Sequence, residues 1–303
     1  MILLFGAGGQ LGQEVAGQAM RAGLPLIPLS HAQVDIADQR SVGRAINESR
    51  ALMVVNAAAY NKVDEAESEP EAAYKVNAVG AAVVAQACAD AGLPLVHLST
   101  DYVFDGSKGG AYHENDSVAP LGAYGRTKAE GERAVRRLNP KHLILRTAWL
   151  YGVHGKNFLK TMLRLTAERD ELHVVADQRG SPTSSADLAE AILRIRTRLG
   201  SVPWGTYHFA GTGETTWRGF ASRIVEAQAV FTGRRPEVKK ITLADFPAKA
   251  RRPQNSVLDS SRFAAVFGFK AEPWEQAVDR TVAELQQREE KPLRRTTTFA
   301  ILS

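Results

Sequence analysis

The sequence predicts an α/β protein built on a doubly wound parallel sheet, and three observations lead to this prediction. Short apolar runs alternate with longer helical segments along the chain. A glycine-rich turn joins the first run, residues 2–5, to the first helical segment. Later runs end in small or hydroxyl-bearing residues, as in "NAAAY" and "LSTDYVFDG". In a sheet of this kind helices cover both faces, and ligands bind beyond the carboxyl ends of the strands.

The first strand, turn and helix are read from "MILLFGAGGQLGQEVAGQAMRAG". Gly6 permits a tight turn, Gly9 lets backbone N–H groups approach a pyrophosphate, and Gly12 lets the helix sit close to the strand. The positive end of the helix dipole then faces the phosphates. A glycine pattern alone is weak, but this one lies between a strand and a helix, which is the context that a dinucleotide-binding turn requires.

The second strand, "LPLIPLS", ends at Ser30, and His31 follows it. Folds that prefer NAD usually carry an acid here, which binds the ribose hydroxyls. Because no acid follows this strand directly, a 2′-phosphate meets no repulsion; NADPH is allowed and NADH is not excluded. Asp35 follows, and it either caps the next helix or lies beside the adenine.

The third strand ends at Asn56, and residues 57–59 are alanines that leave room for a flat ligand. The fourth, "LPLVHL", runs into Ser99 and Thr100. Since this is again the carboxyl end of a strand, the hydroxyl groups are expected to face the same ligand.

A catalytic group is predicted from "AYGRTKAEGERAVR", where Tyr124 and Lys128 share one face of a helix. Tyrosine is a poor acid at neutral pH because its reference pKa is about 10. A neighbouring ammonium group lowers that pKa, and a hydroxyl such as Thr100 or Ser99 stabilises an oxygen that accumulates negative charge. Lysine can also hold the nicotinamide ribose. These groups suit hydride transfer to a carbonyl, with the proton delivered by tyrosine.

With these motifs the chain resembles the extended short-chain dehydrogenase/reductase family, which has the Rossmann fold. It is most similar to the dTDP-4-dehydrorhamnose reductases within that family. The likeness rests on "VVNAAAYNKVDEAESEPEAAYKVNA", "LSTDYVFDG", "PLGAYGRTKAEGE" and "LRTAWLYG", and it continues through "ADQRGSPTSSADLA" and "RRPQNSVLDSS". It covers nearly the whole chain. One departure is Asn61, where many relatives have threonine.

The resemblance implies a set of site residues. Thr100, Tyr124 and Lys128 would be catalytic. The cofactor would be bound by Gly6, Gly9, Gln10, Leu11, Gly12, Ser30, Asp35, Ile36, Ala58, Ala59, Tyr60, Asn77, Ser99, Tyr124 and Lys128. The substrate would be bound by Thr100, Asp101, Tyr102, Trp149 and Arg252. Two alternatives stay open: Trp149 as a core aromatic, and Arg252 as a solvated loop arginine rather than a diphosphate ligand.

The resemblance also implies a magnesium site at a homodimer contact, through Glu14, Glu190 and Glu284. Carboxylates suit a hard divalent ion. Each of these glutamates also lies in a helical pattern, where a solvated acid is the ordinary alternative.

Two domains and a tail are expected along the chain. Residues 1–150, with late strands from about 170–212, form the dinucleotide-binding domain. Residues from about 213–290 form a smaller α/β substrate lobe, and residues 291–303 form a tail that is either disordered or packed elsewhere by its apolar end. "TYHFAG" is read as a strand that returns to the sheet.

Composition sets limits on partners and location. The chain has 303 residues and a formal net charge of +5, with basic residues scattered rather than arranged in a stripe. That suits an anionic small molecule and disfavours nucleic acid. Cys88 is the one cysteine, so no internal disulfide forms. With no signal peptide and no apolar run that could span a bilayer, a cytoplasmic protein without a membrane partner is expected.

The expected activity is reduction by NADPH or NADH of the 4-keto group of dTDP-6-deoxy-L-lyxo-4-hexulose to dTDP-L-rhamnose, a step in dTDP-rhamnose and polysaccharide biosynthesis. One alternative is a reductase for another nucleotide-linked 4-keto sugar, since base and sugar selectivity reside in loops. Another is a non-catalytic NADP-binding regulatory subunit of the same fold, such as the partner of methionine adenosyltransferase. The serine, threonine, tyrosine and lysine argue against that second alternative.

Overall fold

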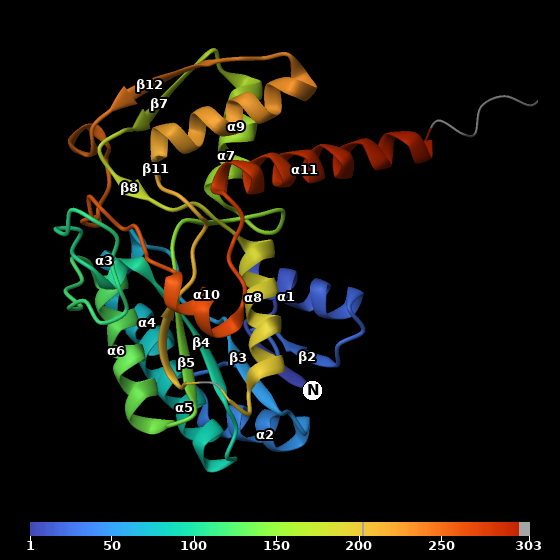
Figure 1. Ribbon diagram of the computed structural model, residues 1–303, viewed down its shortest axis with the longest axis vertical. Coiled ribbons are helices and arrows are strands. Elements are labelled where there is room, and N and C mark those ends of the chain that lie inside the picture. Colours follow the sequence, from blue (N-terminus) through green and yellow to red (C-terminus); the bar gives the residue numbers. More distant parts are fainter. Residues whose placement is uncertain (202, 297–303) are drawn as a thin grey trace, which may run out of the picture.

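A six-stranded parallel sheet forms the centre of the protein. The structure is a computed structural model that describes residues 1–201 and 203–296, with side chains described up to residue 288 (Figure 1). The strand order is β10-β5-β4-β3-β1-β2. The strands are β1 (Ile2–Phe5), β2 (Leu26–Leu29), β3 (Met53–Asn56), β4 (Leu95–Thr100), β5 (His142–Thr147) and β10 (Gly205–His208). Every neighbouring pair is parallel. The predicted fold class is therefore confirmed, as is the return of "TYHFAG" to the sheet.

Helices cover both faces of this sheet (Figure 1). One face packs against α1 (Gln10–Arg21), α8 (Ser185–Ile195) and α10 (Ser261–Phe267). The other packs against α2 (Gln39–Ser49), α5 (Ala81–Asp90) and α6 (Ala123–Leu138). Because the central strands are covered on both sides, they are apolar without alternation: β1 and β3 are buried along their whole length.

A second lobe lies beyond the carboxyl ends of the strands, at the top of Figure 1. It has its own core, in which aromatic and aliphatic side chains of three helices pack together. Its elements are α7 (Phe158–Glu168), β7 (Glu171–Val175), α9 (Trp217–Thr232), β12 (Glu237–Ile241) and α11 (Trp274–Thr296). β7 and β12 form a separate parallel pair. Two short ladders, β6 (Leu150–Tyr151) with β9 (Thr183–Ser184) and β8 (Arg179–Gly180) with β11 (Thr215–Thr216), join the lobes.

Three segments lie in a different part of the structure from the one that the sequence-based division into domains assigned to them. β7 falls among the expected late strands of the first domain, but it pairs with β12 in the second lobe. α10 falls within the expected substrate lobe, but its Phe263 and Phe267 pack in the core of the central sheet. The expected tail from residue 291 begins inside α11, which continues to Thr296; residues 297–303 lie outside the described residues. We propose that the substrate lobe is built from α7, β7, α9, β12 and α11.

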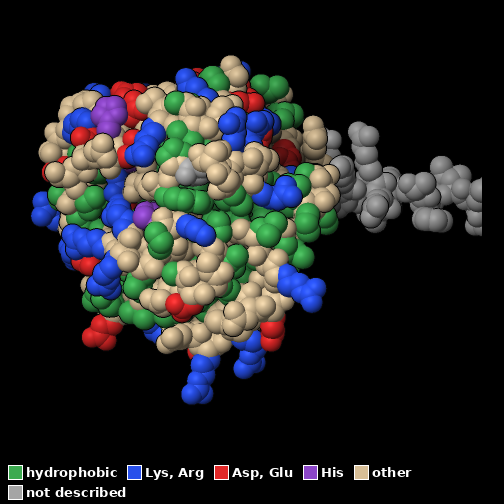
Figure 2. All heavy atoms as spheres, turned by 60° about the horizontal axis from the view of Figure 1, so that its bottom comes forward, with side chains coloured by type: hydrophobic (Ala, Val, Ile, Leu, Met, Phe, Trp, Pro, Cys, Tyr) green, Lys and Arg blue, Asp and Glu red, His purple; other side chains and the backbone are tan. Residues whose placement is uncertain are grey.

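The remaining helical segments lie in connections. They are α3 (Glu65–Ser68), α4 (Pro70–Tyr74), the π-helical turn η1 (Lys75–Gly80), and the 3₁₀ turns η2 (Asp101–Val103), η3 (Arg196–Arg198) and η4 (Leu243–Asp245). Within residues 1–201 and 203–296, no helix combines the length and apolar character that a membrane crossing requires. On the face in Figure 2, lysine and arginine side chains are dispersed among acidic, apolar and neutral ones.

Candidate active site

A cavity of about 860 Å³ lies at the carboxyl ends of β1, β2, β3, β4 and β5. The polar strand ends that were singled out in the sequence meet here, as expected for a parallel sheet. The predicted site residues that line it are Gly6, Gly9, Gln10, Leu11, Ser30, Asp35, Ile36, Ala58, Ala59, Tyr60, Ser99, Thr100, Asp101, Tyr102, Tyr124, Lys128, Trp149 and Arg252. Gly12, Asn77, Glu14, Glu190 and Glu284 are not among the lining residues.

The glycine-rich turn is packed too closely for larger residues. Gly6 has φ +83°, and a Cβ atom there would lie 2.5 Å from the backbone nitrogen of Ala58. A Cβ atom on Gly12 would lie 2.2 Å from the carbonyl oxygen of Gly6. Gly9 is the N-cap of α1 and supplies no capping side chain. The first backbone N–H groups of α1 are therefore free of a side-chain cap at the edge of the cavity, where an anionic group is favoured.

The segment after β2 resolves one of the alternatives for Asp35. Asp38, not Asp35, is the N-cap of α2, and its side chain accepts from the Arg40 backbone N–H. Asp35 accepts from the Ala37 backbone N–H at 3.0 Å and lines the cavity. The helix-capping alternative is wrong, while contact with an adenine stays a prediction.

Asn77 acts on the backbone of a lining residue rather than on the cavity itself. Its Oδ1 accepts from the Tyr60 N–H at 2.9 Å, and its Nδ2 donates to the Tyr60 carbonyl at 3.0 Å. Nδ2 also donates to the Thr127 hydroxyl on α6. Because η1 is π-helical, its wider turn brings this amide against the segment that follows β3. Asn77 thus fixes the position of Tyr60, whose own side chain reaches Glu69.

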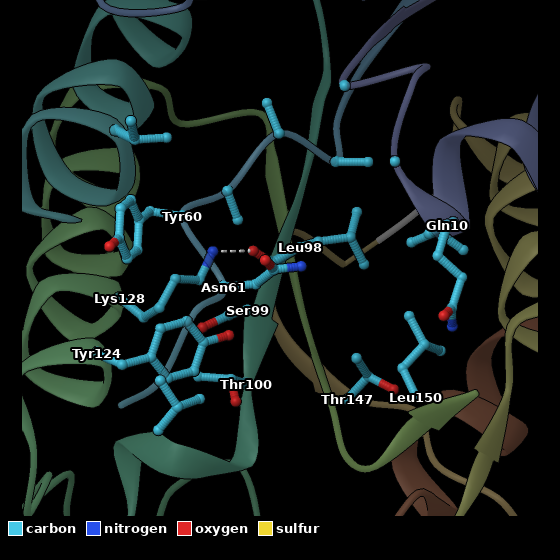
Figure 3. Close-up of a pocket in the computed structure, with 18 of the residues that line it drawn as sticks. Gln10, Tyr60, Asn61, Leu98, Ser99, Thr100, Tyr124, Lys128, Thr147 and Leu150 are labelled. Atoms are coloured by element: carbon cyan, nitrogen blue, oxygen red, sulfur yellow. Dashed lines mark hydrogen bonds between the residues drawn. The ribbon is translucent and has the colours of Figure 1, made fainter. Parts of the chain in front are cut away.

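Tyr124 and Lys128 project from α6 toward the end of β4, which carries Ser99 and Thr100 (Figure 3). Lys128 is 2% exposed, and its ammonium group donates to the carbonyl oxygen of Leu98 at 2.6 Å. Burial lowers the pKa of Lys128 to about 8, although the charge of Glu132 opposes this shift. The ammonium form therefore predominates at neutral pH.

The pKa of the phenol does not shift in the direction expected from the sequence. Burial raises the pKa of Tyr124 to about 12; the Thr100 hydroxyl acts against this shift, and the charge of Asp101 adds to it. The expected lowering by Lys128 is thus absent among the described residues, because that ammonium group is directed to the backbone of β4. At neutral pH the phenol is protonated, which is the form that a proton donor needs.

Asp101 is the buried acid of the site. It is 2% exposed, its Oδ1 accepts from the Thr100 hydroxyl at 2.9 Å, and its Oδ2 has no hydrogen-bond partner within the described chain. Burial raises the pKa of Asp101 to about 6, although the hydroxyl groups of Ser256 and Thr100 act against this shift. An unpaired carboxyl oxygen at a cavity wall is a candidate partner for a hydroxyl group of a ligand.

Arg252 is not a solvated loop residue. Its side chain is 18% exposed and forms an ion pair with Asp64, Nη2 to Oδ2, at 2.7 Å. The guanidinium also lies 5.6 Å from the centroid of the Phe246 ring. Asp64 further accepts from the Ala250 backbone N–H. The loop from β12 is therefore tied to the segment after β3 beside the cavity.

Trp149 lies between the lobes, with φ +45°. Its ring stacks on Trp217 of α9, with centroids 3.7 Å apart and planes 8° apart. A Cβ atom on Gly180 would lie 2.3 Å from the Trp149 ring. The ring thus packs against hydrophobic clusters of both lobes and still lines the cavity, so it serves as core aromatic and as pocket wall.

Several lining residues were not singled out from the sequence. They include Gly8, Val63, Val76, Thr147, Leu150, Phe158 and Trp217. Thr147 could have been found, because it ends β5 as Thr100 ends β4 and the two are paired in register. Phe158 and Trp217 begin helices of the second lobe, and nothing in their local pattern separates them from core aromatics.

The three glutamates proposed for magnesium each have an arginine partner in the same chain. Glu14 pairs with Arg21 at 3.4 Å, Glu190 with Arg194 at 2.6 Å, and Glu284 with Arg288 at 2.7 Å. Glu14 also lies 3.5 Å from His154 Nε2. Among the residues that the structure describes, no three acidic, histidine or cysteine side chains gather as a metal site needs. A site shared between two copies stays a prediction.

Comparison with known proteins identifies the family. The family model for the RmlD substrate binding domain matches residues 1–287. A dTDP-4-dehydrorhamnose reductase of Sinorhizobium fredii is 42% identical over 285 residues, which is 93% of this chain and 96% of the relative. The crystal structure of a Clostridium acetobutylicum dTDP-4-dehydrorhamnose reductase has a TM-score of 0.88 and 39% identity, over 94% of this chain and 99% of that one. The crystal structure of the Bacillus anthracis dTDP-4-dehydrorhamnose reductase in complex with NADP has a TM-score of 0.86 and 37% identity, over 93% of this chain and 98% of that one. The chain therefore belongs to the dTDP-4-dehydrorhamnose reductase family and is an oxidoreductase.

Proposed function

We propose that the protein reduces the 4-keto group of dTDP-6-deoxy-L-lyxo-4-hexulose, with NADPH or NADH as reductant, to give dTDP-L-rhamnose. The observation that carries the proposal is the meeting of Thr100, Tyr124 and Lys128 in one cavity with an uncapped helix N-terminus. The names of the relatives point to the same substrate.

The residues at one end of the cavity fit a dinucleotide. The N-terminus of α1 has no side-chain cap, which suits a pyrophosphate. The Nε2 of Gln10, the first residue of α1, has no partner within residues 1–201 and 203–296. Ser30 and His31 line the cavity after β2, where an acid would repel a 2′-phosphate. We therefore infer that NADPH is accepted, and the NADP held by the Bacillus anthracis relative is consistent with this.

The nicotinamide would supply a hydride to C4 of the sugar. The Thr100 hydroxyl, which donates to Asp101 Oδ1 in this structure, would turn to donate to the keto oxygen, on which negative charge develops. Tyr124 transfers its phenolic proton to that oxygen, so the new C–O–H group is completed and a phenolate is left. Lys128, one helical turn away and cationic at neutral pH, uses one N–H on the Leu98 carbonyl and would stabilise the phenolate with its remaining donors. Because the pKa of Tyr124 is raised to about 12, the phenol is protonated before each turnover.

The substrate would extend toward the second lobe. Asp101 and Tyr102 from β4 and η2 would contact the sugar, and Trp149 would border it. Arg252 would bind the diphosphate by exchanging part of its contact with Asp64 for phosphate oxygens.

The direct test is NADPH oxidation, followed by absorbance, with dTDP- and GDP-linked 4-keto sugars compared side by side. We expect the dTDP substrate to be reduced with the higher kcat/KM. A preference for the GDP sugar would support the alternative of another nucleotide-linked 4-keto sugar. Binding of NADPH without oxidation by any of these sugars would support the non-catalytic subunit.

We propose in addition that two copies share a magnesium ion through Glu14, Glu190 and Glu284, as the resemblance implies. Glu14 and Glu190 lie on α1 and α8, which contact each other through Gln18 and the Ala186 carbonyl. Sedimentation with magnesium and with a chelator tests this: a dimer that dissociates on chelation is expected, and a mass unaffected by magnesium contradicts it.

A further inference from the structure

A buried ionic network lies directly behind the catalytic face of α6. Glu132 is 0% exposed and Arg146, on β5, is 1% exposed. Arg146 Nε donates to Glu132 Oε1 at 2.8 Å and Nη2 donates to Oε2 at 2.7 Å. Arg136 adds a bond to Oε2 at 2.6 Å. Burial would raise the pKa of Glu132. The hydrogen bonds and charge of Arg146, the charge of Arg136 and the hydrogen bond from Ser99 outweigh burial and lower this pKa to about 2. The carboxylate is therefore ionised at every working pH.

The network reaches the site through Ser99. The Ser99 hydroxyl donates to Glu132 Oε1 at 2.6 Å. Ser99 lies between Leu98, whose carbonyl accepts from Lys128, and Thr100. The Glu132 carboxylate thus fixes the Ser99 side chain. Ser99 stands between Leu98, which binds Lys128, and Thr100, so the bond holds the end of β4 where both proposed catalytic residues meet. A hydrophobic pair of similar volume would stabilise the fold as well as a buried ion pair does, so stability alone does not explain these charges.

Glu132 also lies four residues after Lys128 on the same face of α6. Two other ionisable groups beside the ammonium group, Tyr124 and His97, are uncharged at neutral pH. The pKa of Tyr124 is raised by burial to about 12. The pKa of His97, on β4, is lowered well below its ordinary value by burial and by Lys128 itself. Asp101 is ionised at neutral pH, but its charge acts on the pKa of Tyr124 and not on that of Lys128. Glu132 is the anion that supports the charge of Lys128 in this buried setting.

We propose that Glu132 is a positioning residue of the active site: paired with Arg146, it keeps Lys128 in the ammonium form and holds Ser99, and through it the end of β4, in place. The role of Lys128 in this statement rests on the proposed function. Glu132 acts without touching substrate or cofactor, so its effect is expected in the pH dependence of the reaction and in the titration of Lys128.

The test is an NMR titration of protein labelled with ¹³C at the lysine Cε, without substrate, in which the Lys128 signal is assigned by its absence in Lys128→Met. Glu132→Gln keeps the shape of the side chain and removes its charge. We expect the pKa of Lys128 to fall by about one unit, as loss of an adjacent opposite charge does. The alkaline limb of kcat/KM for the dTDP sugar should move to lower pH by the same amount.

Two further variants keep the test decisive. Glu130→Gln makes the same charge change two residues away on α6, where the side chain is 45% exposed, and should leave Lys128 as in wild type. Glu132→Gln with Arg146→Met removes both buried charges, so no buried guanidinium is left unpaired to unfold the protein or repel Lys128, while the partly exposed Arg136 keeps its bond to the Thr206 hydroxyl. In this double variant the pKa should lie between the wild-type and single-variant values.

If the pKa of Lys128 in a folded Glu132→Gln or double variant equals that of the wild type, the proposal is overturned and the network has a structural role only. The proposal is overturned equally if Glu130→Gln shifts Lys128 as strongly as Glu132→Gln. Because the titration needs no substrate, it separates this inference from the proposed function. Absence of NADPH oxidation in the wild type contradicts the function, whereas an unshifted Lys128 contradicts the role of Glu132.

Discussion

The ammonium group of Lys128 lies 2.6 Å from the carbonyl oxygen of Leu98, which directly precedes Ser99 and Thr100 at the end of β4. α6 and β4, which carry the proposed catalytic residues, are therefore joined by a charge-assisted hydrogen bond before any ligand is bound. A lysine anchored in this way has two further donors for a ribose or a phenolate.

Lys128→Met is expected to weaken NADPH binding by about tenfold and to lower kcat by about 10²–10⁴-fold, because both the ribose donor and the support for the phenolate are lost. Fluorescence titration and initial rates measure the two effects. Lys141→Met is the matched control, since Lys141 also donates to a backbone carbonyl, that of Gly92, but on the exposed surface. An unchanged NADPH affinity in Lys128→Met would restrict the lysine to the phenol.

Tyr124→Phe should lower kcat by about 10²–10⁴-fold and leave the dissociation constant of NADPH within about twofold, because only the proton donor is removed. Tyr74→Phe, at a tyrosine that is 49% exposed, should change neither quantity. Near-normal turnover in Tyr124→Phe would remove the phenol from the mechanism.

The sheet and the strand-end part of the site were predictable because their causes are local. Apolar runs without alternation indicate strands covered on both faces, and residues at the ends of parallel strands must meet at one edge. That reasoning placed Gly6, Ser99 and Thr100 at the cavity. It also explains why Thr147 belongs there.

The parts that were not predicted depend on contacts between distant segments. The pKa of Tyr124 is raised by burial, which spacing along a helix does not determine. The Trp149–Trp217 stack joins residues from two lobes. The strand β7 pairs with β12, which lies far along the sequence, so the division of the chain into lobes does not follow its order.

Gly12→Ala is expected to destabilise the protein by about 1–3 kcal/mol and to weaken NADPH binding, because the new Cβ atom would lie 2.2 Å from the Gly6 carbonyl and would push α1 from β1. Gly43→Ala in α2 is the contrasting variant, since a Cβ atom added there would have no neighbouring atom within 4 Å outside its own helix. It should stabilise the helix by about 0.5–1 kcal/mol. Urea unfolding measures both, and equal effects of the two variants would contradict the close packing at Gly12.

Arg252→Met is expected to raise KM for the dTDP sugar by about 10–100-fold and to leave NADPH affinity unchanged, because the guanidinium would bind the diphosphate. Arg234→Met removes an arginine paired with Asp170, whose side chain is fully exposed at 100%, and serves as the control. If Arg252→Met affects NADPH and sugar equally, the arginine does not distinguish the two ligands.

Asp101→Asn should make the protein more stable at pH 8 while it impairs substrate binding. The folded-state pKa of about 6 lies above the ordinary value of 3.8. Between these two values the folded protein binds more protons than the unfolded chain, so stability falls as pH rises, and the penalty is complete above pH 6. Two pKa units correspond to about 3 kcal/mol, taken as an upper bound.

Urea unfolding of wild type and Asp101→Asn at pH 4 and pH 8 tests this directly. The stability of the variant relative to wild type should rise by up to about 3 kcal/mol from the lower pH to the higher, and comparing the two pH values cancels any effect that does not depend on pH. Asp170→Asn changes a carboxylate that is 100% exposed. The pH dependence of its unfolding free energy should follow that of the wild type far more closely. Parallel curves for wild type and Asp101→Asn would mean that the Asp101 carboxylate is solvated in the folded protein, and the sugar contact assigned to it would then lose its physical basis. A relative gain confined to the higher pH, together with a raised KM, would show that the site keeps a destabilising buried acid because the substrate needs it.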